Sequence, residues 1–445
     1  MQTPDRDAGL VQSANRDLGL ARVIGAVGLS ASIFSMLVGA GIFVVPAQLA
    51  AAVGAAAPLA VLLCAVAIGA IGICLADSLS RVPSSGGLYA AVEEAFGPCA
   101  GYVGGTLFWV SNVMACAAVT SALGDAVASA LPHAIEPAAR PAVIVAAVIA
   151  ICAVNARGAK RGVRLVTAAA LLKGAPLLVF LLVGIFWVRG GNLSWPSTFS
   201  AGGVGRALLL TLFTFQGFET ALCASGEVRD PARTIPRALL LALLGVTLLY
   251  GAVQFVAQGV LGAALGGSKA PLADAMGGIH PSLRLLMLAG AVVSMFGWIT
   301  ADLLSSPRIL FAFSRDGLLP RFLGRLSADG HAPYMAIWCY ALVVIGLALS
   351  GSFAELAAPA ALVLAALYIA VCAASWVLAR RGVARAGKPL GFRGLGVAAA
   401  IGSASMLALI CLGSRGEILG LAALTLAALA VYLIQTRLIR GTATP

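Results

Sequence analysis

Long stretches without charged side chains alternate with short charged segments along the whole chain. Residues 23–76 form 54 consecutive positions without a charge. A single helix of that length would measure roughly 80 Å, far more than the ~30 Å of a bilayer's hydrocarbon core. We therefore predict two membrane spans there, with a turn at residues 53–58 (VGAAAP). Further charge-poor stretches predict ten more spans, at residues 95–124, 141–156, 165–188, 207–226, 238–268, 285–307, 332–354, 356–379, 394–414 and 418–436.

The composition indicates that most of the exterior faces lipid. Hydrophobic residues make up 61% and charged residues 10% of the chain, and the mean hydropathy is +1.01. Soluble domains average roughly 45–50% and 25%. Within a bilayer each segment must satisfy its own backbone groups, and the stretches are too long and too little alternating for barrel strands. The sequence predicts an all-α polytopic membrane protein with twelve transmembrane helices.

The net charge of +12 follows the predicted topology. With twelve spans, 22 of the 29 Lys and Arg residues fall on the side of the termini, six fall on the other side, and Lys173 lies inside a span. This positive-inside bias places both termini in the cytoplasm, with the spans in the inner (plasma) membrane. The charge therefore indicates a lipid bilayer and no nucleic-acid partner. The nine cysteines are scattered, without CxxC spacing, so we expect no metal and no cofactor.

Two glycines interrupt the first span near its middle. Gly39 and Gly41 flank Ala40 in the stretch SMLVGAGIF, and Pro46 follows. Glycines this close allow a helix to unwind and to present free amides to a carboxylate. They are also typical of a small-residue seam for helix packing, and this motif by itself favours the seam.

A second interruption lies at a corresponding depth in the sixth span. The stretch FTFQGFET, residues 213–220, combines Gly217 with the polar Gln216 and the ionisable Glu219. The two spans begin about 180 residues apart, and matched interruptions in two five-helix halves indicate an inverted-repeat transporter whose site lies between the repeats. Together the two motifs favour a binding site.

Four stretches carry a family resemblance. They are VGAGIF (38–43), PSSGGLY (83–89), TFQGFET followed by EVRDPARTIPR (227–237), and SRDGLLP (314–320). In this combination and order the chain resembles the amino acid-polyamine-organocation (APC) superfamily of amino acid transporters. The resemblance implies a LeuT-like 5+5 inverted repeat, with five-helix repeats at 23–188 and 205–379, two further helices at 394–436, and cytoplasmic tails at 1–22 and 437–445.

The resemblance also implies a substrate site at the two interruptions. The amides of Gly39, Ala40 and Gly41 would bind a substrate carboxylate. Its amino group would be bound by carbonyls near Leu37, Phe213 and Gln216, beside Gly217. An amino acid is a zwitterion, and two broken helices supply the amides and carbonyls that both poles need. Phe213 and Phe215 fit an aromatic gate, although aromatic residues at this spacing often only pack.

Lys173 is a candidate proton carrier. It lies about nine residues into the fifth span, roughly 13 Å from the cytoplasmic end. Burial disfavours the charged form of a lysine, so that it can gain and lose a proton during transport. Some proton-coupled relatives carry a lysine here, where sodium-coupled transporters of this fold hold sodium. By that resemblance it would face the unwound first span and Ser305 or Ser306. The alternative is a side chain that extends to the cytoplasmic surface.

Two acids inside the spans leave alternatives open. Glu219 fits a proton site linked to pH sensing in some antiporters, or a neutral structural carboxyl. Asp302 stands where family members often have an uncharged residue that lines the cavity. It would bind a cationic substrate, pair with Lys173, or bond a serine or water away from both.

These observations predict a secondary active transporter for amino acids, proton-coupled through Lys173. The alternative is an exchanger for basic amino acids or polyamines without proton coupling.

We find no H-E-x-x-H, G-x-S-x-G or Walker A motif and no domain-sized loop, which argues against an enzyme. A channel would show a charged or carbonyl-lined pore, and a glycine break does not exclude it. The amino acid, the direction of transport and the oligomeric state stay open.

Overall fold

The computed structural model describes residues 25–82, 88–129, 131, 136–156, 168–169, 172–194, 200–222, 228–315, 317–326, 333–385 and 389–441. The predicted tail at 1–22, positions 83–87 of PSSGGLY, Glu227 and Asp316 lie outside these residues. Within the described residues the chain is helical and has no strand. The α-helices are α2 (Ala26–Leu37), α3 (Gly41–Val53), α4 (Ala57–Arg81), α5 (Leu88–Phe96), α6 (Pro98–Ala128), α7 (Glu136–Ala156), α9 (Gly174–Gly184), α10 (Ala201–Thr214), α11 (Phe218–Leu222), α12 (Pro231–Leu261), α13 (Pro271–Gly277), α14 (Pro281–Ser305), α15 (Pro307–Arg315), α16 (Tyr334–Ser350), α17 (Phe353–Arg380), α18 (Leu395–Cys411) and α19 (Arg415–Gly441).

The lengths of the helices fit a chain that crosses a membrane many times. Among the described residues, seven helical stretches are long and apolar enough to span a bilayer, and four apolar helices are shorter. One of the shorter helices, α2, ends at Leu37 because the first span is interrupted there. The number of twelve spans and the inverted repeat stay predictions.

The turn expected at residues 53–58 is a short 3₁₀ helix, η1 (Gly54–Ala56). Gly54 adopts φ +56°, a conformation that suits glycine because it has no Cβ. α3 therefore ends at Val53, and α4 begins within a few residues. The long uncharged stretch at the start of the chain is divided as predicted.

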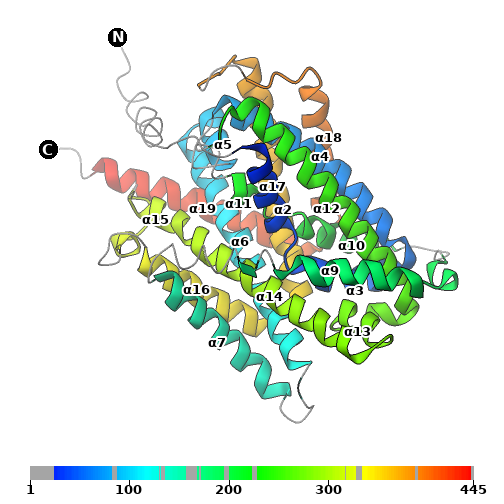
Figure 1. Ribbon diagram of the computed structural model, residues 1–445. Helices are drawn as coiled ribbons and strands as arrows, with labels where there is room; N and C mark the ends of the chain where they lie inside the picture. Colours follow the sequence, from blue (N-terminus) through cyan, green and yellow to red (C-terminus); the bar gives the residue numbers. More distant parts are fainter. Residues whose placement is uncertain are drawn as a thin grey trace.

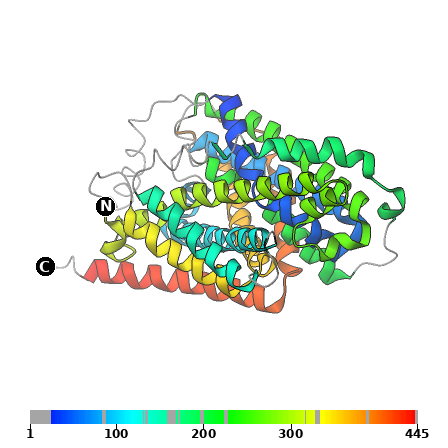
Figure 2. The ribbon, with the colours of Figure 1, turned by 60° about the horizontal axis from the view of Figure 1, so that its bottom comes forward.

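The helices form one bundle around the two interruptions. α4 and α12 lie side by side along one flank, and α12 also contacts α2 (Figure 1). α17 crosses the interior and packs against α6, α10, α4 and α18. α7, α14 and α16 pack together on the other flank, as the turned view in Figure 2 shows, and all three contact α6. Between the two flanks α10 packs against α3, and α11 packs against α2.

The outer surface is apolar, as a lipid-facing surface must be. Leucines on α19 such as Leu419 and Leu426 are about two-thirds exposed, and Leu248 on α12 is 73% exposed. A soluble protein rarely exposes so large a contiguous apolar surface. This surface explains why the hydrophobic fraction of the chain exceeds what its core requires.

Asp77, near the end of α4, is completely buried. Its carboxylate accepts a hydrogen bond from Arg81 Nε at 2.6 Å, and both side chains are almost completely buried. The backbone amide of Gly391 also donates to Asp77, at 3.2 Å. Arg81 donates from Nη1 to the carbonyl of Val383 at 3.2 Å. The pair thus fastens the segment that follows α17 to the end of α4.

Candidate functional site

The structure interrupts two helices at the motifs singled out in the sequence. α2 ends at Leu37 and α3 begins at Gly41, so that residues 38–40 are not helical. α10 ends at Thr214, and α11 begins at Phe218. Between them Gly217 has φ +121°, a conformation that residues with a Cβ rarely adopt.

Each glycine of the motifs lies where another helix passes very close. A Cβ on Gly39 would lie 2.7 Å from Cδ1 of Trp298, on α14. A Cβ on Gly41 would lie 2.9 Å from Cγ2 of Thr214, at the end of α10. The two expected roles of these glycines therefore coincide, because the residues that unwind the helix also allow its neighbours to approach.

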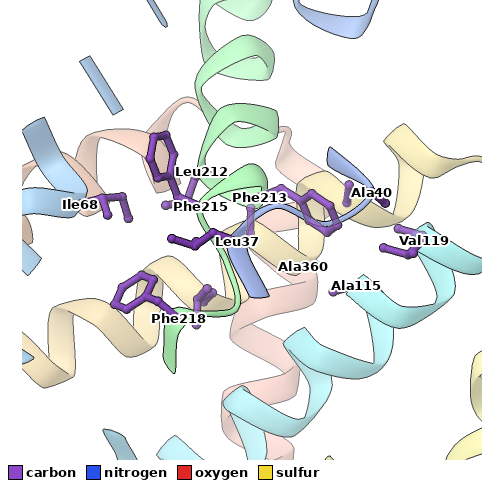
Figure 3. Close-up of a cluster of buried hydrophobic side chains, with 14 of the residues drawn as sticks. Leu37, Ala40, Ile68, Ala115, Val119, Leu212, Phe213, Phe215, Phe218 and Ala360 are labelled. Atoms are coloured by element: carbon purple, nitrogen blue, oxygen red, sulfur yellow. The ribbon is translucent and has the colours of Figure 1, made fainter. Parts of the chain in front are cut away.

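The second break lies directly against the first. A Cβ on Gly217 would lie 3.3 Å from the carbonyl oxygen of Met36, in the last turn of α2. α11 accordingly packs against α2, and α10 packs against α3. The two interruptions, far apart in the sequence, form one region of the molecule (Figure 3).

The break frees carbonyl oxygens at the end of α2, and one of them binds Lys173. The amide of Gly39 donates to Leu37 at 2.7 Å and so does not reach Ser35, its partner in a continuous helix. The ammonium of Lys173 donates to the Ser35 carbonyl instead. A cation is favoured there because a helix dipole is negative at the C-terminus. Lys173 faces the first break, and Ser305 and Ser306 donate to other groups.

The amides of the first break differ in their bonding. The Gly39 amide is bonded to Leu37, so in this conformation it is not a free donor. Ala40 is the N-cap of α3, and Gly41 is its first residue. The first amides of a helix lack a carbonyl one turn back and carry the positive end of its dipole. The start of α3 therefore presents the positive end of a helix dipole to the break.

Tyr250 joins the two breaks, a role that the sequence did not indicate. Its hydroxyl, on α12, lies 2.5 Å from the carbonyl oxygen of Leu37 and 2.9 Å from that of Thr214. One hydroxyl proton thus serves the ends of both α2 and α10. Tyr250 lies inside an apolar stretch without a motif, and only its position beside both helix ends reveals its contact.

A small cavity lies between the breaks. Its volume in this conformation is about 10 Å³, which is room for roughly one water molecule. Four of its wall residues, Leu37, Ala40, Val119 and Phe213, surround the break in Figure 3. The residues that line it are Leu37, Gly39, Ala40, Gly41, Val119, Phe213, Thr214, Gln216 and Trp298. Six of these were expected from the motifs. Val119 and Trp298 were missed, because nothing in the sequence places α6 and α14 at this point, whereas Thr214 lies within the motif of α10 and was not singled out.

The two phenylalanines expected at a gate occupy different positions. Phe213 lines the cavity and makes an edge-to-face contact with Phe353, with 5.3 Å between ring centroids. Phe353 lines a second, larger cavity together with Phe43. Phe213 and Phe353 thus lie between the two cavities. Phe215 is completely buried and packs edge-to-face on Tyr250 at 5.6 Å, away from the cavity.

Glu219 and Gln216 hold the second break. Glu219 is fully buried, and its Oε2 accepts a hydrogen bond from the amide of Gly217 at 2.6 Å. The side-chain nitrogen Nε2 of Gln216 donates to the hydroxyl of Ser111, on α6, at 2.8 Å. These bonds connect the non-helical residues to α11 on one side and to α6 on the other.

Asp302 does not reach the cavity. Its two carboxylate oxygens accept hydrogen bonds from the hydroxyls of Ser306 and Tyr340, each at 2.6 Å. It is 3% exposed and is not among the residues that line the space between the breaks. Of the three arrangements left open by the sequence, the structure has the one with a serine partner, outside the lining of the cavity between the breaks, while Lys173 donates to Ser35.

Comparison with known proteins agrees with this architecture. The family model described as "Amino acid permease" matches residues 24–433. The chain is similar to a methylthioribose transporter of Bacillus subtilis, with 26% identity over 76% of this chain and 77% of the relative. It is also similar to the branched-chain amino acid permease BcaP of that organism, with 26% identity over 74% and 75%. The serine/threonine exchanger SteT, again of Bacillus subtilis, is 28% identical over 75% and 77%.

The fold and the match define a multi-pass membrane transport protein and not an enzyme. The chain belongs to the amino acid permease family, within the APC superfamily that its motifs resemble.

Proposed function

We propose that this protein is a secondary active transporter that moves amino acids across the plasma membrane, coupled to protons through Lys173. In this proposal two five-helix repeats, 23–188 and 205–379, enclose the site, and both termini lie in the cytoplasm. The substrate binds in the cavity between the breaks. The start of α3 binds its carboxylate, and carbonyls near Leu37 and Phe213 bind its amino group.

The contact of Lys173 with Ser35 carries the proposal. The protonated amine donates a hydrogen bond to the Ser35 carbonyl, which the break leaves without its helical amide donor. Loss of the proton removes the positive charge and weakens this contact, so the end of α2 is free to move. Because the same end of α2 borders the substrate cavity through Leu37, protonation and substrate occupancy act on one element.

The test is uptake of a panel of labelled amino acids by proteoliposomes, with a proton gradient, a sodium gradient or no gradient. We expect accumulation with the proton gradient alone. Lys173→Ala abolishes it, and Lys173→Arg abolishes it too because an arginine keeps its proton. Unchanged proton-driven uptake by Lys173→Ala, or a strict requirement for sodium, would refute the role of Lys173. Saturation and counterflow in the wild type separate a carrier from a pore.

The position of Asp302 argues against the alternative function, an exchanger for basic amino acids or polyamines. A basic amino acid or polyamine would need a carboxylate in the cavity, and Asp302 is bonded to Ser306 and Tyr340 outside it. The relatives, a methylthioribose transporter, a branched-chain amino acid permease and a serine/threonine exchanger, are named for different substrates. Family membership therefore leaves the substrate to the walls of this chain's own cavity.

A further inference from the structure

The side chain of Gln216 is held in one orientation by its neighbours. The hydroxyl of Ser111 donates its proton to the carbonyl of Ala360 at 2.9 Å. Having used its only proton, this hydroxyl can only accept a hydrogen bond from Gln216, which fixes the NH₂ group of the amide toward Ser111. The carbonyl oxygen Oε1 of Gln216 therefore points away from Ser111.

Oε1 of Gln216 is a buried acceptor without a hydrogen-bond partner among the described residues. The residue is 5% exposed and lines the cavity between the breaks. A buried amide oxygen left without a donor is unfavourable, and most native proteins supply one. At the wall of a binding cavity, the missing donor is one that a ligand can bring.

We propose that Gln216 Oε1 accepts a hydrogen bond from the side chain of the substrate and so selects small amino acids that carry a hydroxyl. This inference rests on the proposed function, and it adds the class of substrate. The α-amino group is assigned to the backbone carbonyls, so Oε1 is available to the side chain. An amide oxygen without a nearby carboxylate does not compensate a full positive charge, which disfavours basic side chains.

The walls of the cavity limit the size of that side chain. Val119, Phe213 and Trp298 line it, and Gly39 and Gly41 bring the backbone close to Trp298 and Thr214. The volume in this conformation is only about 10 Å³, so each added atom of a substrate side chain has to displace these walls. A short hydroxyl-bearing side chain fits these walls better than a long or aromatic one.

The test compares threonine with the nearly isosteric valine, and serine with the smaller alanine, in proteoliposomes. We expect kcat/KM for threonine to exceed that for valine by about tenfold or more, since a site that binds a hydroxyl rejects the analogue without it. Gln216→Leu lowers the threonine-to-valine ratio of kcat/KM toward one, and any loss that comes from disturbance of the second break affects the two substrates alike. Ser111→Ala, which frees the amide to rotate, lowers the same ratio by less.

Gln258→Leu is the matched control. Gln258 is 4% exposed, and its Oε1 likewise has no partner among the described residues, but it lies on α12 outside this cavity. The threonine-to-valine ratio should not change in this variant.

Equal transport of threonine and valine by the wild type would overturn the inference and leave the proposed function standing. Equal loss of both substrates in Gln216→Leu would assign Oε1 to the α-amino group and would also overturn it. Absence of any amino acid transport would refute the proposed function itself.

Discussion

Gly39 and Gly41 lack side chains where two other helices come closest. The sequence alone could not distinguish a binding break from a packing seam at this motif. The structure shows that each glycine is in contact with a particular partner, Trp298 for Gly39 and Thr214 for Gly41. The packing of α14 and α10 is therefore matched to the two positions that the motif supplies.

The close contact of Gly41 with Thr214 predicts that removal of one methyl group from Thr214 compensates for a methyl group added at Gly41. Gly41→Ala places its Cβ 2.9 Å from Cγ2 of Thr214, and overpacking of this kind costs about 1–3 kcal/mol. Thr214→Ser removes that methyl and keeps the hydroxyl, which donates to Thr211 at 2.6 Å. We expect Gly41→Ala to lower thermal stability in detergent and the rate of uptake. The double variant Gly41→Ala with Thr214→Ser should recover most of both. A double variant as impaired as Gly41→Ala would show that the contact is not the cause.

At the scale of elements, the end of α2 is held by groups from three other helices or breaks. Lys173 binds the Ser35 carbonyl, Tyr250 binds Leu37, and Gly217 lies against Met36. A helix that ends inside a membrane must have its last carbonyls satisfied by neighbours, because lipid supplies no donors. The broken helix is therefore a property of the assembled bundle as well as of its glycines.

Removal of one hydroxyl tests this assembly. Tyr250→Phe leaves the carbonyls of Leu37 and Thr214 without their common donor, at a cost of about 1–3 kcal/mol. We expect a lower melting temperature and slower uptake. Tyr368→Phe is the control, because the hydroxyl of Tyr368 is buried without a partner among the described residues, and its loss should be neutral or stabilising. Equal effects of the two variants would contradict the role of Tyr250.

At the scale of the molecule, Phe213 and Phe353 separate the cavity between the breaks from the larger cavity beside α3 and α14. Phe213 follows from the motif in α10, whereas Phe353 is the first residue of a helix that begins some 140 residues later. The contact between their rings joins the second break to α17. This contact depends on how the helices pack in the bundle, and the sequence of either segment by itself does not predict it.

If the rings of Phe213 and Phe353 separate the two cavities, removal of one ring should let substrate pass between them more easily. Phe353→Ala removes one ring of the pair, so we expect faster efflux of labelled substrate down its gradient and less accumulation at steady state. Phe186→Ala is the control, because Phe186 is 86% exposed on the lipid-facing surface. Efflux should be measured from preloaded proteoliposomes. Unchanged efflux in Phe353→Ala would show that the two rings do not limit movement between the cavities.

The sequence by itself determined the membrane class, the helical architecture and the places where two helices break. These follow from charge-free length, glycine and proline, which act locally, and the motifs added the family. The tertiary structure decided which side chains meet at the breaks. Trp298, Val119 and Tyr250 come from spans without a motif, and Asp302 is held by Tyr340 on a separate helix. Such contacts depend on how helices pack across hundreds of residues, and an apolar span carries no pattern that specifies its neighbours.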